Sequence, residues 1–476
     1  MNVYDRIYIN GQFVKPMGTE ELELRNPVNK QVTGKVVLGN VDDTRNAIEA
    51  AKAAFKSFSK TSIEERMEIL ARLHDSLSQR FDKLTEATVS EYGAPVSVAK
   101  MLTQIAVNAF SHMKETVESY PFVRPAGTAQ VRMAPVGVVG VITPWNANAT
   151  HLANKLAPSL AAGCTVVVKP SEFSAAQTEL FMEAVHAANI PAGVINIVNG
   201  KGEVVGEELT RHPDVTGITF TGSTAVGKRI AAGAAANLKR ITLELGGKSP
   251  SVILDDADLT KAVPLAVSAG FINSGQACLA GTRVLVPESR LDEVKRLMAE
   301  TVGALKVGDL WNEAAVIGPM VNEKQFERVQ HYINQAINDG AEVVVGGAGS
   351  PEGLDGGYYV KPTVFANVTN DMTIAQEEVF GPVLSIITYK TEEEAIEIAN
   401  DTPYGLQAFV FSGSTERGNR VAEQIVAGRI SVNGLHDEPQ APFGGFKNSG
   451  IGRDHGSYGL EQYLEPKAIL GRNAVM

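Results

Sequence analysis

The chain has 476 residues, of which 44% are hydrophobic and 20% charged, and its formal net charge is −11. These values exclude a disordered chain, predict two or three globular domains, and argue against a general affinity for nucleic acid or an anionic membrane. The two cysteines cannot form a disulfide framework and the first residues lack the apolar core of a signal peptide, so we expect a cytoplasmic protein.

The first 80 residues predict a hairpin followed by packing helices. Residues 7–14 alternate around an Asn-Gly pair, which is the strongest short signal for a β-hairpin. Asp42 is the expected N-cap of a first helix, and Ser62 with Glu65 forms a capping box before a second one. Arg66, on the second helix, is expected on its solvated face.

Three later stretches are typical of buried strands, and each runs into a loop of small or polar residues. The strands are residues 137–142, 165–169 and 215–220, and the loops are residues 143–146, 170–172 and 221–223. Strands that alternate with helices predict an α/β fold. The loops that follow buried strands are where such folds place their chemistry.

The third loop has the pattern of a P-loop. Residues 222–228 fit GxxxxGK, but the position that should carry the Mg²⁺-binding Ser or Thr is Arg229. We therefore expect a helix N-terminus that meets a pyrophosphate through Ser223 and backbone amides, without a GxGxxG fingerprint. A Mg²⁺-dependent NTPase is the alternative.

Cys278 is the candidate nucleophile, because residues 273–283 around it are small and favour a loop. The alternative is a buried cysteine that packs as a small hydrophobe. Glu244 follows a predicted strand and precedes a glycine pair, so it is a candidate general base or a surface carboxylate. Asn146, taken alone, is a turn residue after a strand. Scattered histidines and the lack of HExxH or CxxC give a metal site no support.

Five motifs occur together in one order along the chain. They are Thr143-Pro-Trp-Asn146, Glu244-Leu-Gly-Gly-Lys-Ser-Pro250, Asn273 to Arg283, Glu378-Val-Phe-Gly-Pro382 and Pro442-Phe-Gly-Gly-Phe-Lys447. This set resembles the NAD(P)-dependent aldehyde dehydrogenase superfamily, from about Ile7 to Ile469.

The resemblance implies an α/β fold with two doubly wound domains and a small β ribbon for oligomerisation. The dinucleotide-binding domain would comprise residues 1–117 and 136–245, and the catalytic domain residues 246–445. The ribbon would comprise residues 118–135 and 460–476, and it implies a homodimer or homotetramer because an exposed edge strand needs a partner.

The resemblance also implies a mechanism. The thiolate of Cys278 attacks the aldehyde, and Asn146 with the Cys278 N–H group holds the oxyanion of the thiohemiacetal. After hydride transfer to NAD⁺, Glu244 activates the water that hydrolyses the thioester, which favours the free acid over transfer to coenzyme A or phosphate. Lys155 joins a proton relay or is a solvated lysine. The alternative function is a catalytically silent, nucleotide-binding member of the fold.

The expected cofactor is NAD. Glu172 accepts ribose hydroxyls and repels a 2′-phosphate, although Lys169 is compatible with both NAD and NADP. Glu378 is expected on the nicotinamide ribose and Phe380 beside the ring. The residues expected to bind the cofactor are Thr143, Pro144, Trp145, Lys169, Ser171, Glu172, Gly222, Ser223, Leu245, Gly246, Glu378 and Phe380.

The expected substrate is a small-molecule aldehyde with a polar body, such as a semialdehyde or an aldehyde with a hydrogen-bonding ring. The wall of the substrate tunnel is expected to be smaller and more polar than in many relatives, because Ala147, His151 and Asn154 share one helical face. Phe443 would line the same tunnel, and Asp437 at its mouth would discourage a carboxylate. Asp454 stands where relatives often carry a glutamate proposed as a second base.

Overall fold

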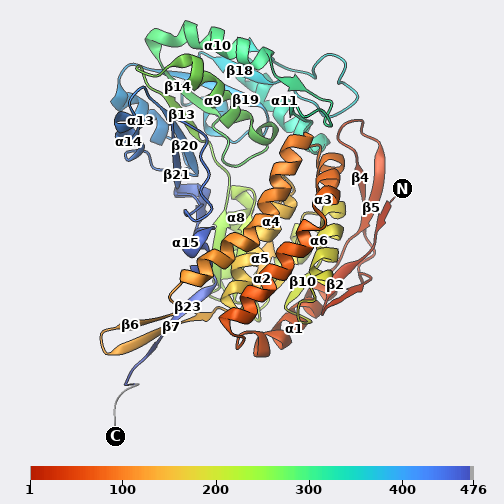
Figure 1. Ribbon diagram of the computed structural model, residues 1–476. Helices are drawn as coiled ribbons and strands as arrows, with labels where there is room; N and C mark the ends of the chain where they lie inside the picture. The colour runs from red at the N-terminus through yellow and green to blue at the C-terminus, as the bar shows by residue number, and fades with distance from the viewer. Residues whose placement is uncertain (1, 472–476) are drawn as a thin grey trace.

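The computed structural model describes residues 2–471, which form two α/β bodies and a projecting β arm (Figure 1). The first body carries α1 to α6 and is drawn in red to yellow, and the second carries α9 to α14 and is drawn in green to blue. Within the described residues, no helix combines the length and the apolarity that a membrane span requires.

The sheet of the first body has eight strands in the order β22-β12-β11-β8-β9-β10-β2-β3. Its strands are β2 (Ile7–Ile9), β3 (Gln12–Val14), β8 (Val138–Ile142), β9 (Thr165–Lys169), β10 (Ile195–Ile197), β11 (Gly217–Thr221), β12 (Arg240–Glu244) and β22 (Gly450–Ile451). The pairs from β12 to β10 are all parallel. Because chain order reverses between β8 and β11, their carboxyl ends form a topological switch point, where doubly wound sheets bind ligands.

Helices cover both faces of this sheet and contribute most of the first core. They are α1 (Val41–Phe58), α2 (Ile63–Ser78), α3 (Phe81–Ala87), α4 (Val96–Ser119), α5 (Asn148–Ala162), α6 (Ala175–Ala187), α7 (Glu207–Arg211) and α8 (Thr224–Ala235). The largest core cluster joins α2, α4, α5 and α6 to β8 and β9. A small sheet of β1 (Asn2–Tyr4), β5 (Val32–Val37) and β4 (Glu21–Arg25) lies outside it.

The local predictions for the first 80 residues hold with two corrections. The hairpin is confirmed, with Asn10 and Gly11 at φ 52° and 80° as its turn requires. The capping box of Ser62 is confirmed. The first helix is capped by Asn40 instead of Asp42, because the Asn40 side chain accepts the N–H groups of the first turn.

The second correction concerns Arg66, which is buried and not on a solvated face. Its guanidinium donates to the carbonyl groups of Ala162 at 2.9 Å and Thr61 at 3.0 Å, and also reaches Ala161 and Ser59. It thereby satisfies carbonyls at the C-terminus of α5, which have no helical partner. Gly163 at φ 90° makes room, since a Cβ atom there would lie 2.6 Å from the Arg66 Cζ atom.

The sheet of the second body has seven strands in the order β17-β18-β19-β14-β13-β20-β21, parallel except for β17. Its strands are β13 (Pro250–Ile253), β14 (Arg283–Pro287), β17 (Glu342–Val345), β18 (Thr363–Ala366), β19 (Val383–Tyr389), β20 (Gln407–Phe411) and β21 (Arg429–Val432). Its helices are α9 (Leu259–Phe271), α10 (Leu291–Gly303), α11 (Glu323–Asn338), α12 (Thr373–Gln376), α13 (Glu392–Asn400) and α14 (Thr415–Ala422). A two-stranded sheet, β15 (Lys306–Val307) with β16 (Ala315–Ile317), lies beside them.

The arm is a three-stranded antiparallel sheet that projects from the first body (Figure 1). The hairpin of β6 (Val123–Ala126) and β7 (Ala129–Pro135) pairs with β23 (Leu464–Ile469) of the same chain, from Leu464 opposite Pro135 to Ile469 opposite Gln130. The short helix α15 (Gly456–Glu461) precedes β23, so the strand begins four residues after the predicted boundary at 460. Residues 472–476 of the predicted ribbon lie outside the described residues.

We expect Arg66→Met to lower the free energy of unfolding by about 2–4 kcal/mol, because it leaves several buried carbonyl groups without a donor. The check is a lower melting temperature. The control is Glu68→Met on the same helix, at an exposed position. An unchanged melting temperature for Arg66→Met would contradict the role assigned to the guanidinium.

Candidate active site

Cys278 lies in the loop between α9 and β14, at the edge where the second sheet faces the carboxyl ends of the first. The turn before it contains Asn273, Ser274 and Gly275, all at positive φ (52°, 59° and 73°). Gln276 fixes this loop: its amide donates to Pro319 O at 3.2 Å, and its Oε1 atom accepts Val321 N at 3.1 Å. Nothing in the sequence around Gln276 indicates that its side chain is buried.

The two cysteines are in different environments. Cys164 is fully buried and donates its S–H group to Tyr463 O at 3.4 Å. It is therefore this cysteine that packs as a small hydrophobic residue. Cys278 remains partly exposed. Burial, followed by the nearby carboxylates of Glu378 and Glu244, raises the pKa of the Cys278 thiol to about 12. The thiol is therefore protonated at neutral pH until something favours the thiolate.

Asn146 is held against the cysteine loop by two hydrogen bonds. Its Nδ2 atom donates to Gln276 O at 2.9 Å, and its backbone carbonyl accepts Asn273 Nδ2 at 2.9 Å. A side-chain amide has two N–H groups, and the bond to Gln276 uses one of them. The other is free to donate to an oxygen held near the thiol, with no change of charge.

Glu244 ends β12 and is buried, and neither of its carboxylate oxygens has a hydrogen-bond partner. Burial, with a further contribution from Asp454, raises the pKa of Glu244 well above its ordinary value. Such a carboxyl exchanges a proton closer to neutral pH than a solvated one does. Gly444, at φ 152°, leaves it space, since a Cβ atom there would lie 2.7 Å from Glu244 Oε1. Sequence reasoning missed this glycine.

Lys155 is buried, so the solvated alternative for this residue is wrong. Its Nζ atom donates to Thr219 Oγ1 at 2.9 Å and forms an ion pair with Asp454 Oδ2 at 3.2 Å. The second oxygen of Asp454 is buried without a partner. Lys155 in turn lowers the pKa of Glu244, whereas Asp454 raises it. The charges of Lys155, Asp454 and Glu244 therefore influence one another.

Unsatisfied polar groups gather at the switch point of the first sheet. The hydroxyls of Thr143 after β8 and Thr221 at the end of β11 are buried without a partner, which predicts that a polar ligand satisfies them. Ser223 is the N-cap of α8 and its side chain makes no capping hydrogen bond, and Gly222 N donates to Glu244 O at 3.0 Å. This edge suits a phosphate-containing ligand.

Lys169 and Glu172 lie together beyond β9, joined by an ion pair of 2.8 Å. The lysine is buried and the glutamate is half-buried, so one carboxylate oxygen remains available for a hydroxyl group. Ser171 between them is buried and accepts Phe173 N at 3.3 Å. The half-buried carboxylate of Glu172 beside the buried Lys169 is compatible with the ribose site that the sequence predicts.

Glu378 and Phe380 reach the site from the second body. The Oε1 atom of Glu378 accepts Gly247 N at 3.1 Å, and a Cβ atom on Gly246 would lie 2.7 Å from its Oε2 atom. Burial raises the pKa of Glu378 to about 7. Phe380, at φ 65°, packs edge-to-face on Trp145, with ring centroids 5.5 Å apart.

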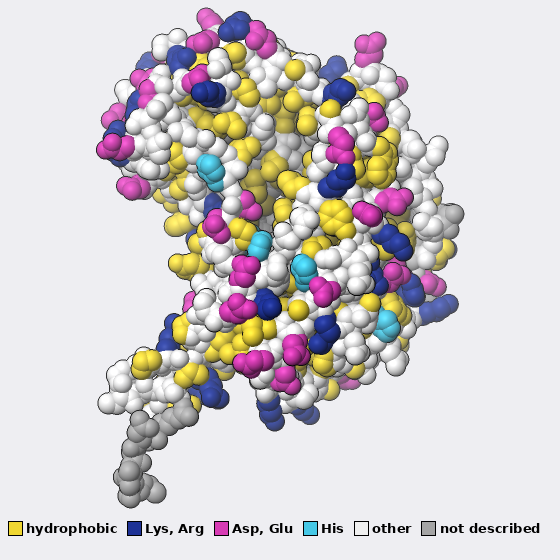
Figure 2. All heavy atoms as spheres, viewed as in Figure 1, with side chains coloured by type: hydrophobic (Ala, Val, Ile, Leu, Met, Phe, Trp, Pro, Cys, Tyr) yellow, Lys and Arg dark blue, Asp and Glu magenta, His cyan; other side chains and the backbone are white. Residues whose placement is uncertain are grey.

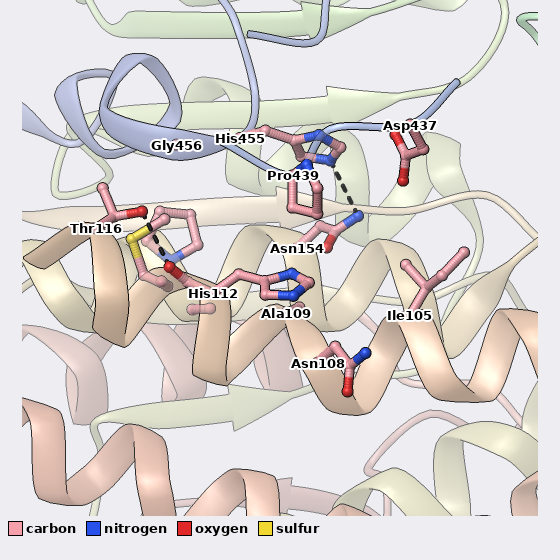
Figure 3. Close-up of a pocket in the computed structure, with 13 residues that line it drawn as sticks. Ile105, Asn108, Ala109, His112, Thr116, Asn154, Asp437, Pro439, His455 and Gly456 are labelled. Atoms are coloured by element: carbon pink, nitrogen blue, oxygen red, sulfur yellow. Dashed lines mark hydrogen bonds between the residues drawn. The ribbon is translucent and has the colours of Figure 1, made fainter. Parts of the chain in front are cut away.

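The residues expected along the substrate wall are divided between two environments. Ala147 is the N-cap of α5, and Asn154, two turns further on, lines a cavity of about 270 Å³ (Figure 3). His151 does not line it: burial and Lys155 lower its pKa to about 3, and its Nε2 atom is buried without a partner. Phe443 stacks on His455, with ring centroids 5.5 Å apart.

Three comparisons identify the relatives of this chain. The model of the aldehyde dehydrogenase family matches residues 13–469. Aldehyde dehydrogenase C of Pseudomonas syringae, solved as a cysteine-to-alanine mutant with NAD⁺ and octanal, is 43% identical, with a TM-score of 0.98 over 99% of this chain and 98% of that one. An aldehyde dehydrogenase of Mycobacterium tuberculosis, solved with NAD⁺, is 40% identical, with a TM-score of 0.96 over 100% and 99%.

A third relative is named for a specific reaction. The 3-succinoylsemialdehyde-pyridine dehydrogenase of a Pseudomonas species is 43% identical over 99% of both chains. These identities extend over the full length of the proteins, and they confirm the predicted family and fold. The chain therefore belongs to the aldehyde dehydrogenase family and is an oxidoreductase.

Proposed function

We propose that this enzyme oxidises an aldehyde to the carboxylic acid with NAD⁺, with Cys278 as nucleophile, Asn146 as oxyanion donor and Glu244 as general base. One observation carries the proposal. The thiol of Cys278 lies near enough to Glu244 and Glu378 for both carboxylates to raise its pKa, and Asn146 is hydrogen-bonded to its loop.

The residues present fit NAD⁺. The free hydroxyls of Thr143 and Thr221 and the half-buried carboxylate of Glu172 provide hydrogen-bonding groups for a dinucleotide. We assign the nicotinamide end to Glu378 and Phe380 and the adenosine end to Lys169 and Glu172. When bound, NAD⁺ supplies the hydride acceptor and a positive charge that favours the thiolate.

The reaction follows from the groups around the thiol. The partly exposed Cys278 thiol gives its proton to solvent water, its Sγ atom forms a bond to the aldehyde carbon, and the C=O π electrons move to the oxygen, which becomes an oxyanion held by Asn146 and the Cys278 N–H group. Loss of hydride from that carbon leaves a thioester. Glu244 then takes a proton from water, the resulting hydroxide adds to the thioester, and the C–S bond breaks with release of the acid. The ion pair of Lys155 and Asp454 is a route for the proton away from Glu244.

We infer that the substrate is polar. Five uncharged polar side chains line the cavity beside α5, namely Asn108, His112, Thr116, Asn154 and His455. One relative is named for an aldehyde that bears a pyridine ring and a ketone, and another holds octanal. The polar groups in this mixed lining favour the first kind of substrate, because an alkyl chain would leave the buried Nδ1 atom of His455 without a partner.

The arm supports a proposal on assembly. Its outer strands, β6 and β23, each have one unpaired edge among the described residues. Exposed edges of this kind are completed by another chain, so we infer a homo-oligomer with an even number of subunits.

Replacing the nucleophile is the first test. Cys278→Ala should abolish NADH formation across a panel of aldehydes while NAD⁺ binding persists, because the thiol is needed only for the chemistry. Cys164→Ala is the matched control and should retain activity. NAD⁺ binding without turnover by the unaltered protein would instead favour a catalytically silent member of the family.

Replacing the base separates the two halves of the reaction. Glu244→Gln should give a burst of about one NADH per site and then turnover slower by 10²–10⁴-fold, because the thioester persists without a base. In the unaltered enzyme, steady-state turnover should rise with pH through the raised pKa of Glu244, since only the deprotonated carboxylate accepts a proton. A variant without a burst, or one with full turnover, would contradict this assignment.

Replacing the ribose ligand tests the cofactor preference. Glu172→Gln should raise kcat/KM for NADP⁺ relative to NAD⁺ by about tenfold, because it removes the negative charge that repels a 2′-phosphate. The measurement is the ratio of the two cofactors at one saturating aldehyde concentration. Glu203→Gln, at an exposed position in the same body, should leave the ratio unchanged.

A further inference from the structure

The cavity of about 270 Å³ lies between α4, α5 and the segment from Asp437 to Gly456 (Figure 3). One face of α4 provides a wall of alternating apolar and polar side chains, and Asn154 of α5 points toward His455 across it. The space-filling view shows yellow and white atoms in the hollow between the two bodies, while charged side chains gather on the outer surface (Figure 2).

The only formal charge on the described residues that line the cavity is negative. Neither Lys nor Arg is among the described residues that line the cavity, and Asp437 is its one carboxylate. Arg429 lies close by, but it already pairs with Asp437 at 2.9 Å and stacks over the Phe443 ring. An anionic group in this cavity would meet a carboxylate and would have to compete with it for that arginine.

His455 provides a hydrogen-bonding group that has no protein partner. Burial lowers its pKa, so the ring is neutral at pH 7. Its Nε2 atom lies 3.4 Å from Asn154 Nδ2, which can only donate, so Nε2 accepts and Nδ1 carries the proton. The Nδ1 atom is buried and makes no hydrogen bond. A buried donor without an acceptor destabilises the protein unless a bound molecule satisfies it.

The backbone of His455 is strained as well. Its φ of 70° and ψ of 152° belong to a region that is almost exclusive to glycine. Glycine at this position would relieve the strain but would remove the ring that contacts Asn154 and Phe443. A strained residue is retained when its side chain has a function, and here the side chain lines a cavity.

The geometry of α5 gives the distance between the start of this helix and the polar pair of Asn154 and His455. Asn154 is seven residues beyond Ala147, and Ala147 is adjacent to the oxyanion donor Asn146. At 1.5 Å per residue, the polar pair of Asn154 and His455 lies about 10 Å along α5 from the start of the helix.

We propose that this cavity binds the far end of the aldehyde, two turns along α5 from the oxyanion donor Asn146, and that this end is an uncharged hydrogen-bonding group, such as a ring nitrogen, ketone or hydroxyl. The proposal rests on the proposed function and specifies its substrate. A semialdehyde that ends in a carboxylate is disfavoured by Asp437, and an aldehyde that ends in a methyl group leaves the Nδ1 atom of His455 without a polar partner.

The test compares three aldehydes of equal length that end in a pyridyl ring, a carboxylate or a methyl group, with propanal as a short reference. We expect kcat/KM to be highest for the pyridyl compound, by about tenfold over the methyl compound, and lowest for the carboxylate. A preference for the methyl or carboxylate compound would overturn the proposal and leave the proposed function intact. No turnover of any of the four, propanal included, would overturn the proposed function and this proposal with it.

Variants assign the preference to the two residues. His455→Gly and Asn154→Leu should each lower the ratio of pyridyl to methyl kcat/KM by about tenfold. His455→Gly should also melt within about 2 °C of the unaltered protein, because relief of strain offsets the lost ring contacts. Leu238→Gly, another positive-φ position that is 93% exposed, is the matched control and should leave the ratio unchanged. Unchanged ratios in both site variants would overturn the proposal.

Discussion

The close approach of two backbones at Gly246 and Gly247 is the constraint on which the site depends. A Cβ atom at Gly247 would lie 2.5 Å from Cys278 O, and one at Gly246 would collide with the Glu378 carboxylate. Only residues without side chains let the cysteine loop and the end of β12 meet. This contact joins the two sheets at opposite strand ends, so that side chains from separate bodies share one small, poorly solvated volume.

Poor solvation determines the protonation of the groups in that volume. Burial is the largest influence on Cys278, Glu244 and Glu378, and in each case it raises the pKa. Lys248 shows the converse, because burial lowers its pKa to about 7. The resting site therefore carries less charge than its residues would in water. A cationic ligand changes this balance for all the carboxyl and thiol groups together, which couples binding to activation.

Much of the fold and the centre of the site could be predicted from the sequence. The hairpin at Asn10, the capping box at Ser62 and the buried strands have local signals, and the proposed role of Cys278 rests on the motifs. Arg66, Gln276 and His455 could not be found in this way, because burial, a hydrogen-bond partner and strain depend on segments far along the chain. Asn108 and His112 on α4 carry no local signal of a cavity, and only the folded arrangement places them beside one.

The arm has a consequence for how the enzyme matures. Strand β23 completes the arm from the last part of the chain, and Asp454 just before it reaches Lys155, which precedes it by 299 positions. The buried ammonium of Lys155 has no ionic partner until that segment arrives. During synthesis, the charge of the first body is therefore not balanced until the segment around Asp454, which follows the second body, has been added. A form without that segment that still folded would bury the Lys155 ammonium uncompensated, so the stability of the first body depends on residues beyond the second.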